Sequence, residues 1–329
     1  MKKALALLLA AVMLLGALTA CGSKNDNAAD DAQNTADEDK AAADHVAALI
    51  DAIYVQERTD ETDAQCEEAK AAWDALTDAQ KAMVEGEEAS PDYFGLDTGD
   101  AALDDPRNQD GIGENELLVV SFGTSYNDSR VNDIKSIEDA LQEAYPDWSV
   151  RRAFTAQIII NHIQARDGEK IDNMTQALER AVANGVKNLV VQPTHLMGGL
   201  EYTDVKDELD KYADKFDKIS LGDPLLTSDD DFKKVAAAIK ENMASFDDGK
   251  TALCLMGHGT EADSNADYAK MQEVFKNEGL TQFFVGTVEA EPTCEDVIAA
   301  ASAAGYKKAV LAPFMVVAGD HANNDMADE

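Results

Sequence analysis

The hydrophobic pattern from residue 114 onward alternates between short apolar runs and longer amphipathic segments. Short apolar runs are typical of buried strands, and apolar residues spaced by three and four predict helices. The expected strands are 117–122, 150–154, 189–192, 219–221, 252–256, 283–288 and 309–314. The expected helices are 131–145, 173–184, 201–216, 229–245, 265–278 and 293–304. This alternation predicts an α/β fold with parallel sheets covered by helices.

Two stretches of this region resemble each other. Residues 117–125 read LLVVSFGTS and residues 252–260 read ALCLMGHGT, so each is an apolar strand followed by a small, polar, glycine-containing turn. Such an echo predicts two similar lobes, which we place at 114–240 and 241–329. Ligands of open α/β sheets bind beyond the carboxyl ends of the strands, so the candidate site lies there.

Three different segments precede the lobes. Residues 22–43 are small, polar and acidic and predict a solvated tether, and residues 91–113 have the Gly, Pro and Asp content of a linker. Between them, apolar residues at helical spacing predict a helical module at 44–90. Its stretches LIDAI and AAWDALTDAQKAMV resemble the short helical modules repeated in bacterial surface proteins. Modules of that kind are more often spacers or interaction elements than sites.

The N-terminus has the pattern of a targeting signal. Lys2 and Lys3 precede an apolar run over 4–20, and the run ends Leu-Thr-Ala before Cys21. This ending resembles a bacterial lipobox, which implies a lipoprotein signal peptide at 1–21 and lipidation of Cys21. A plain transmembrane anchor is the alternative, although the run is short for a membrane span. Lipidation would anchor the protein on a membrane, with its body outside the cytoplasm.

Charge excludes one class of partner. The chain has 64 acidic and 28 basic residues and a formal net charge of −36, so nucleic acid is not expected to bind. Residues 24–110 alone hold 25 acidic and 6 basic residues, which leaves 39 acidic and 20 basic residues from position 111 onward. The four cysteines form no C-x-x-C pair, which argues against a zinc ribbon.

Polar side chains follow several of the expected strands. The first strand ends in the loop 121–125, the third leads to His195, the fifth to His258, the sixth to Glu289 and the last to His321. The carboxyl ends of parallel strands meet at one edge of a sheet, so these groups are candidates for a common site.

Two imidazoles and a carboxylate are a ligand set for a divalent ion and can also accept protons. We therefore take His258, Glu289 and His321 as the candidate metal and catalytic residues. His45 and His162 fall on helix patterns and are interpreted as surface or core residues. The sequence has no nucleophile elbow, Walker loop or complete dinucleotide fingerprint.

The motifs of this region resemble a known family, the anaerobic cobalt chelatases of cobalamin biosynthesis. The similarity spans about residues 117–329. The motifs that carry it are VVSFGTSY (119–126), RAFTAQII (152–159), MGHG (256–259), VGTVEAEP (285–292) and PFMVVAGDHANNDMADE (313–329). The resemblance implies a two-lobed, ferrochelatase-like fold of the class II chelatases, with a tetrapyrrole in the cleft between the lobes.

The same resemblance implies the chemistry. It assigns the metal-inserting roles to His258, Glu289 and His321, with sirohydrochlorin and Co²⁺ as substrates and no organic cofactor. The family segment QPTHLMGGLEY makes His195 a further candidate for the cleft. Residues of two motifs are expected to bind the tetrapyrrole: Ser121, Gly123, Thr124 and Ser125 of the SFGTS loop, and Arg152 of the RAFT motif. Because the substrate is a polycarboxylate, Arg151 and Arg166 are also considered as its basic partners.

Some alternatives remain open at this stage. Family members continue for about another strand and helix beyond the position of His321, so either this protein has a shortened second lobe or the C-terminal end of that lobe is missing from this sequence. The ligand set also suits Ni²⁺, Fe²⁺ and Zn²⁺. A non-catalytic extracytoplasmic lipoprotein that binds tetrapyrrole or metal is the main alternative function, and a solute-binding lipoprotein is a weaker one. The sequence leaves open whether the chain forms a homo-oligomer.

Overall fold

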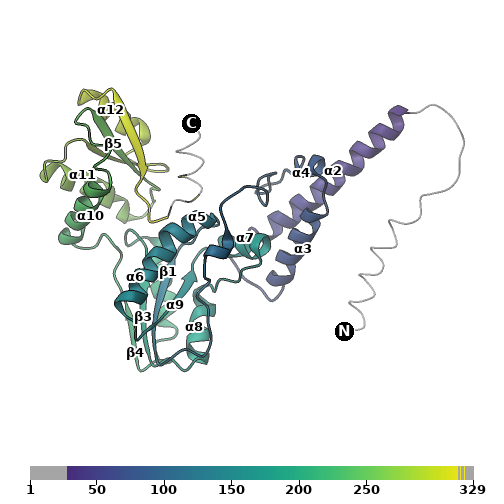
Figure 1. Cartoon of the computed structure of the whole chain (residues 1–329), viewed down its shortest axis with the longest axis horizontal. Helices are drawn as coiled ribbons and strands as arrows, with labels where there is room; N and C mark the ends of the chain where they lie inside the picture. The colour runs from purple at the N-terminus through teal and green to yellow at the C-terminus, as the bar shows by residue number, and fades with distance from the viewer. Residues whose placement is uncertain (1–27, 318, 320–321, 323–329) are drawn as a thin grey trace, which may run out of the picture.

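The architecture was obtained from a computed structural model, which describes residues 28–317, 319 and 322, with side-chain burial from residue 35 onward (Figure 1). The expected signal peptide at 1–21 with Cys21, and the candidate ligand His321, lie outside the described residues. Within the described part, no helix combines the length and apolar character that crossing a membrane requires.

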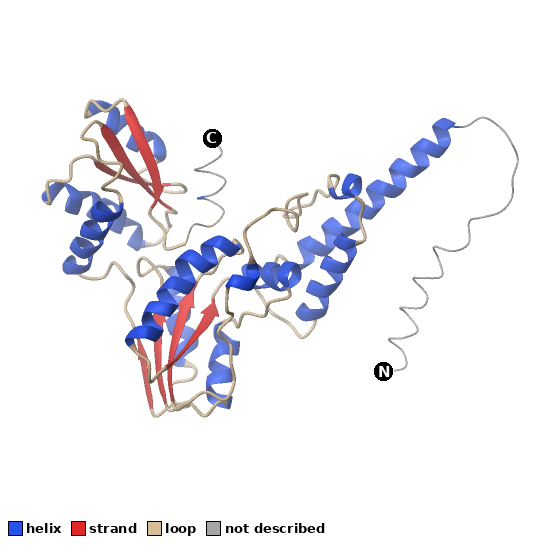
Figure 2. Cartoon of the chain, in the orientation of Figure 1, coloured by secondary structure: helices blue, strands red, loops and turns tan. Residues whose placement is uncertain are grey.

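The first lobe is a four-stranded parallel sheet with helices on both faces (Figure 2). The strand order is β2-β1-β3-β4. The strands are β1 (Asn115–Ser121), β2 (Ser149–Phe154), β3 (Asn188–Pro193) and β4 (Lys218–Leu221). The helices are α5 (Asn127–Ser129), the π-helical turn η2 (Arg130–Lys135), α6 (Ser136–Ala144), α7 (Gln157–Asp167), α8 (Met174–Ala183) and α9 (Leu200–Asp210).

Alternating side chains of β1 supply both layers of this lobe. Leu118 and Val120 join one core with residues of α8 and α9. Leu117 and Val119 join another, which Leu141 of α6 covers. Successive side chains of a strand point to opposite faces of the sheet, and helices cover both faces here. These four residues of β1 are therefore buried, which explains why they form a continuous apolar run.

The second lobe is a three-stranded parallel sheet in the order β6-β5-β7. Its strands are β5 (Thr251–Gly257), β6 (Phe283–Thr287) and β7 (Lys308–Pro313). Its helices are α10 (Asp229–Asn242), the short η3 (Asp263–Asn265), α11 (Ala266–Asn277) and α12 (Cys294–Ala303). Leu253 and Leu255 of β5 pack toward α10 and α11, whereas Cys254 packs toward α12.

The boundary between the lobes lies earlier than the expected position at 240. Phe232 and Ala236 of α10 are buried in the core of the second lobe, together with Leu253 of β5. The helix therefore belongs to the second lobe, and the connection between the lobes runs over 222–228. Ser228 begins α10 with a capping box in which Ser228 and Asp231 bond each other's backbone N–H, so a local signal for this boundary is present in the sequence.

The N-terminal module is helical, as expected, but it begins earlier. It contains α2 (Ala28–Ile53), α3 (Thr62–Asp74), α4 (Asp78–Lys81) and the short η1 (Ala101–Leu103). Helix α2 extends into the segment expected to be a tether, and Ala43 is already fully buried in the module core. Alanine, which is frequent in this segment, is the strongest helix former, so the composition supports a helix as well as a solvated chain. Figure 1 shows α2 as the arm that projects from the rest of the molecule.

The module packs against α7 of the first lobe. Ala165 of α7 joins the module core, and the Asn161 side-chain amide donates to the Ile53 carbonyl at 2.8 Å. The Gln157 backbone N–H donates to the Gln56 side chain at 3.2 Å, and the Gln164 amide to Asp63 at 2.8 Å. One face of α7 is therefore buried by segments about a hundred positions away in the chain.

Candidate functional site

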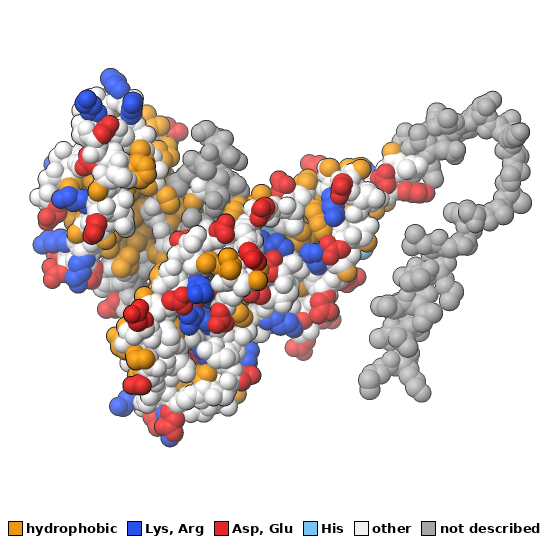
Figure 3. Space-filling model, in the orientation of Figure 1, with side chains coloured by type: hydrophobic (Ala, Val, Ile, Leu, Met, Phe, Trp, Pro, Cys, Tyr) orange, Lys and Arg blue, Asp and Glu red, His pale blue; other side chains and the backbone are white. Residues whose placement is uncertain are grey.

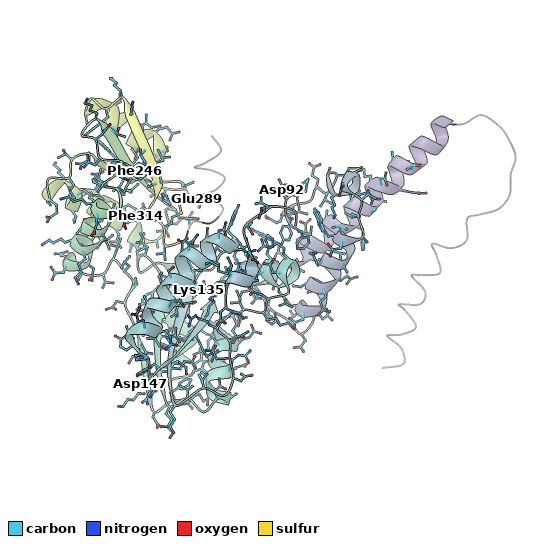
Figure 4. All side chains as sticks on the ribbon, viewed as in Figure 1. Asp92, Lys135, Asp147, Phe246, Glu289 and Phe314 are labelled. Atoms are coloured by element: carbon cyan, nitrogen blue, oxygen red, sulfur yellow. The ribbon has the colours of Figure 1, made fainter. Side chains whose placement is uncertain are left out.

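The carboxyl ends of strands in both lobes open into one cleft of about 940 Å³. The first lobe contributes the loop after β1 and the segment 194–201 after β3, and the second lobe contributes residues that follow β5, β6 and β7. Figure 4 labels Glu289 and Phe314 of the second lobe and Asp92 of the module, all of which line this cleft. Ligand sites commonly have volumes in this range and occur where such strand ends meet.

His258 and Glu289 lie together in the cleft. The His258 Nε2 atom is 3.7 Å from the Glu289 Oε2 atom, and both side chains are about half exposed. The segments that carry them stay paired beyond the sheet, because the Val288 N–H donates to the Gly257 carbonyl and the Glu289 N–H to the His258 carbonyl, both at 2.9 Å. Two neighbouring strands thus place the imidazole and the carboxylate side by side.

A backbone carbonyl fixes the orientation of the His258 ring. His258 Nδ1 lies 2.8 Å from the carbonyl oxygen of Gly259. A carbonyl only accepts, so Nδ1 donates the proton in this contact, and Nε2 is the ring nitrogen that faces Glu289. Separate oxygen and nitrogen donors at this spacing can contact the same divalent ion, with a backbone carbonyl fixing the ring.

Both glycines of the GHG turn are needed for this geometry. A Cβ atom at Gly257 would lie 2.1 Å from the Tyr268 ring. Gly259 has a φ of +95°, and a Cβ there would lie 2.9 Å from Ala290. The turn therefore packs directly against its neighbours, which holds His258 at the cleft.

His195 lines the cleft and has an unusual environment. Both ring nitrogens are buried and have no hydrogen-bond partner among the described residues. Burial lowers the pKa of His195, and the nearby Glu201 carboxylate only partly opposes this effect. The ring is therefore neutral at pH 7, and one of its nitrogens has a lone pair that can accept a proton or contact a ligand.

Some residues of the SFGTS loop line the cleft, and Ser121 instead connects the loop to a neighbouring segment. Gly123, Thr124 and Ser125 line the cleft. Gly123 has a φ of +103°, and a Cβ there would lie 2.6 Å from the Phe154 ring. Ser121, in contrast, is buried at the end of β1, and its hydroxyl lies 2.8 Å from that of Thr194. The expectation that Ser121 binds the substrate is thus corrected: it joins the loop to the segment after β3.

The arginine expectations are also corrected in part. Arg152 is fully buried, and its guanidinium donates to Asp104 and Glu138 at 2.6 to 2.9 Å. Arg151 is equally buried between Glu116 and Asp172. These side chains hold the first lobe together and do not reach a substrate in the cleft.

Of the three arginines considered, Arg166 lines the cleft. It donates to the Ser125 carbonyl at 2.6 Å and to Asp167 at 2.7 Å. It thereby connects α7 to the SFGTS loop. A guanidinium held in this way brings positive charge to the cleft wall and positions the loop.

Several cleft residues have no counterpart in the sequence-based expectations. Phe122 and Leu200 are exposed apolar side chains in the cleft, and Glu201 of α9 lines it as well. Leu200 and Glu201 belong to the QPTHLMGGLEY segment that also contains His195, and Phe122 belongs to the SFGTS loop, so both motifs contained a usable signal. No sequence motif indicated that residues of the module, including Tyr54 and Leu96, line the cleft.

Parallel sheets from two lobes, with an imidazole and a carboxylate set side by side in the cleft between them, define an α/β protein of the chelatase type. Residues 115–329 match the family described as Cobalt chelatase (CbiK), and the chain belongs to this family. The match begins after the module and the linker.

Two relatives agree with this assignment. The chain is 36% identical over 213 residues to the "Sirohydrochlorin cobaltochelatase" of Salmonella typhimurium, a match that covers 65% of this chain and 80% of the relative. It is 26% identical over 213 residues to the "Sirohydrochlorin cobaltochelatase CbiKC" of Nitratidesulfovibrio vulgaris, a match that covers 64% of this chain and 74% of that protein.

Proposed function

We propose that this protein inserts Co²⁺ into sirohydrochlorin, a step of cobalamin synthesis. The observation that carries the proposal is the 3.7 Å pair of His258 Nε2 and Glu289 Oε2 in an inter-lobe cleft of a cobalt chelatase family member. The names of the two relatives support sirohydrochlorin as the tetrapyrrole. The cleft volume of about 940 Å³ suits a large, flat ligand.

The residues of the site support a simple order of events. The lone pair of His258 Nε2 and the Glu289 carboxylate first hold the ion in the cleft, and we propose that His321 completes this set. Metal insertion removes two protons from the ring nitrogens as the ion moves onto them. A donor that releases the ion regains its lone pair at that moment, so the same imidazole or carboxylate can then accept a ring proton. Holding ion and ring together lowers the entropic cost of their encounter.

Anaerobic insertion assays test this proposal. We expect His258→Ala to lower kcat about 100-fold or more, and Glu289→Gln and His321→Ala to lower it at least about tenfold, since each removes a proton acceptor and a metal donor. The matched control is His45→Ala, which changes an exposed histidine of the module and should keep the wild-type rate. The readout is the absorbance change of the tetrapyrrole on metal insertion.

The same assay separates the two candidate functions. Wild-type rates in both His258→Ala and Glu289→Gln would reject the assigned site. A wild-type protein that binds sirohydrochlorin tightly but inserts no metal would favour a carrier of tetrapyrrole or metal on a retained chelatase fold.

We propose that Co²⁺ is the physiological ion and that Ni²⁺ and Fe²⁺ are accepted in vitro. Nitrogen and carboxylate donors bind all three ions, so discrimination depends on geometry and on supply. Competition assays at equal metal concentrations check this. Complete rejection of Ni²⁺ and Fe²⁺ would show that the site is more selective than its donor set implies.

We propose that the protein is lipid-anchored at Cys21 and acts outside the cytoplasm. The basic start, the apolar run over 4–20 and the Leu-Thr-Ala-Cys ending support this proposal. Labelling of cells with a radioactive fatty acid should mark the wild-type protein and leave Cys21→Ala unlabelled. Equal labelling of the two, or none of the wild type, would reject the anchor.

A further inference from the structure

The N-terminal module forms part of the wall of the cleft. The family match starts at residue 115, but the lining residues include Tyr54 at the end of α2 and a second group from the loop 88–98. Tyr93 and Leu96 belong to that loop. A module that resembles a spacer in sequence is therefore continuous with the site that holds His258 and Glu289.

The loop that reaches the cleft is fixed to its own module. The Asp51 carboxylate of α2 accepts hydrogen bonds from the backbone N–H groups of Glu87, Glu88 and Ala89 at 2.9 to 3.1 Å. Phe94 is buried in the module core and contacts the Trp73 ring edge-to-face, with 5.7 Å between ring centroids. These contacts hold residues 86–96 in one conformation.

The loop is also fixed to the first lobe. The Tyr93 ring stacks on the His162 ring of α7, with centroids 4.2 Å apart and planes 11° from parallel. Asn127 donates to the Gly99 carbonyl at 3.1 Å, and the Asp128 N–H donates to the Thr98 carbonyl at 2.8 Å. The wall is therefore joined to the first lobe at Tyr93 and again at Thr98 and Gly99.

The wall presents apolar surface to the cleft. Tyr54 is 39% exposed and Leu96 is 43% exposed, and both line the same cleft as the exposed Phe122 and Leu200 of the first lobe. Apolar side chains from two separate parts of the molecule are thus exposed around one cleft. Figure 3 shows that apolar side chains are also exposed on the outer surface of both lobes. The group around the cleft indicates a surface that an apolar ligand covers.

We propose that the N-terminal module is a substrate-binding part of the chelatase, in which Tyr54 and Leu96 pack against the tetrapyrrole macrocycle opposite Phe122 and Leu200. The proposal rests on the proposed function, because the occupant is the flat, apolar ring that His258 and Glu289 would act on in the same cleft. The module then contributes to affinity for the ring and takes no part in the transfer of metal or protons. Substitutions in the cleft-lining part of the module should therefore change Kd and KM and leave kcat unchanged.

The test uses the full chain and two pairs of exposed residues. The double variant Tyr54→Ala with Leu96→Ala removes apolar surface from the cleft. The matched control, Val55→Ala with Met83→Ala, removes similar side chains of the same module, which are 40% and 38% exposed and lie outside the cleft lining. We expect the cleft variant to raise the Kd for metal-free sirohydrochlorin and the KM for insertion about tenfold. The control should stay within about twofold of the wild type.

A charge variant gives a second and independent measurement. Leu96→Glu places a carboxylate in the cleft against a polycarboxylate ligand, and Met83→Glu places one on the module outside it. Repulsion should raise the Kd of the first variant about tenfold or more and leave the second near the wild type. Both positions are solvent-exposed, so neither change should prevent folding.

The outcomes separate this proposal from the proposed function. If the wild type inserts metal and the cleft variants keep its Kd and KM, the wall does not bind substrate and the inference is wrong, while the chelatase assignment stands. If the cleft variants weaken tetrapyrrole binding in a wild type that inserts no metal, the inference holds and insertion fails. A wild type that does not bind sirohydrochlorin overturns both.

Discussion

At the scale of single residues, His162 shows how the module and the first lobe meet. Its ring is stacked on Tyr93 and lies edge-to-face with Phe94, 6.0 Å between centroids. Burial lowers the pKa of His162 to about 4, and the positive charge of Arg166 acts in the same direction. The imidazole is therefore neutral at pH 7 and contributes to the packed joint as an aromatic ring.

This joint predicts a pH dependence of stability. The pKa of His162 is lower in the folded protein than its ordinary value of 6.5, so the unfolded chain binds a proton first as the pH falls. The resulting stability is fully present above pH 6.5 and is lost as the pH falls toward 4. Between pH 7.5 and 5.0 the free energy of unfolding should drop by about 2 kcal/mol through this residue.

Urea unfolding of the wild type and of His162→Phe at both pH values isolates this effect. The phenylalanine variant keeps an aromatic ring against Tyr93 but cannot bind a proton at this position. Its free energy of unfolding should therefore fall by about 2 kcal/mol less than that of the wild type between the two pH values. Equal losses in the two proteins would show that His162 is not the group that titrates.

At the scale of elements, the segment before β1 is held by buried ion pairs. Asp104 accepts from Arg130 of η2 at 2.7 Å and from Arg152 of β2 at 2.6 and 2.9 Å, and all three side chains are fully buried. Burial opposes the ionisation of Asp104, but the guanidinium groups of Arg152 and Arg130 outweigh it and lower its pKa. Glu138 of α6 pairs with Arg152 from the other side. Asp104 of the linker thus joins η2 to β2, and Arg152 extends the network to α6.

Removal of Asp104 should be strongly destabilising. Asp104→Ala leaves two buried guanidinium groups without one of their carboxylates, and breaking a buried pair in this way costs about 3–5 kcal/mol. The control is Asp147→Ala, at the exposed end of the same lobe (Figure 4), which should change stability by less than about 0.5 kcal/mol. Chemical denaturation measures both, and a loss below about 1 kcal/mol for Asp104→Ala would contradict the role assigned to the network.

At the scale of the whole molecule, the module and the first lobe should behave as one folding unit. Their interface includes the shared core at Ala165, the stack of Tyr93 on His162 and the ion pairs of Asp104. The second lobe is connected to them through the segment 222–228, and Met197 of the segment after β3 is buried in its core. Cooperative unfolding is expected for parts that share buried contacts on this scale.

The two tryptophans of the chain report on this unit separately. Trp73 is buried in the module and Trp148 is partly buried in the first lobe. In Trp148→Phe and in Trp73→Phe, the remaining tryptophan should lose its native fluorescence at the same urea concentration at which circular dichroism shows the loss of helix. A lower midpoint for the Trp73 signal would instead show a module that unfolds on its own.

Much of the fold was predictable because it rests on local patterns. Each expected strand of the two lobes is present within a few residues, and the α/β class with helix-covered parallel sheets is confirmed. The lobe boundary was misplaced because periodicity identifies α10 as a helix but not the sheet against which Phe232 packs.

The site was predictable only in part. His258 and Glu289 come together because neighbouring parallel strands end at the same edge of a sheet, which spacing along the chain already implies. Arg152 and Ser121 were misassigned because a sequence motif does not tell whether a polar side chain at a strand end faces the cleft or a buried partner.

The sequence by itself determined the alternation of strands and helices, the positions of His195, His258 and Glu289 after strand ends, and the family motifs, because each depends on residues close together in the chain. Only the tertiary structure decided which arginine reaches the cleft and that Tyr54 and Leu96 form its wall. The reason is physical: burial and pairing are set by segments far apart, as when Gln56 contacts Gln157 across 101 positions. No local pattern of polar and apolar residues records such a contact.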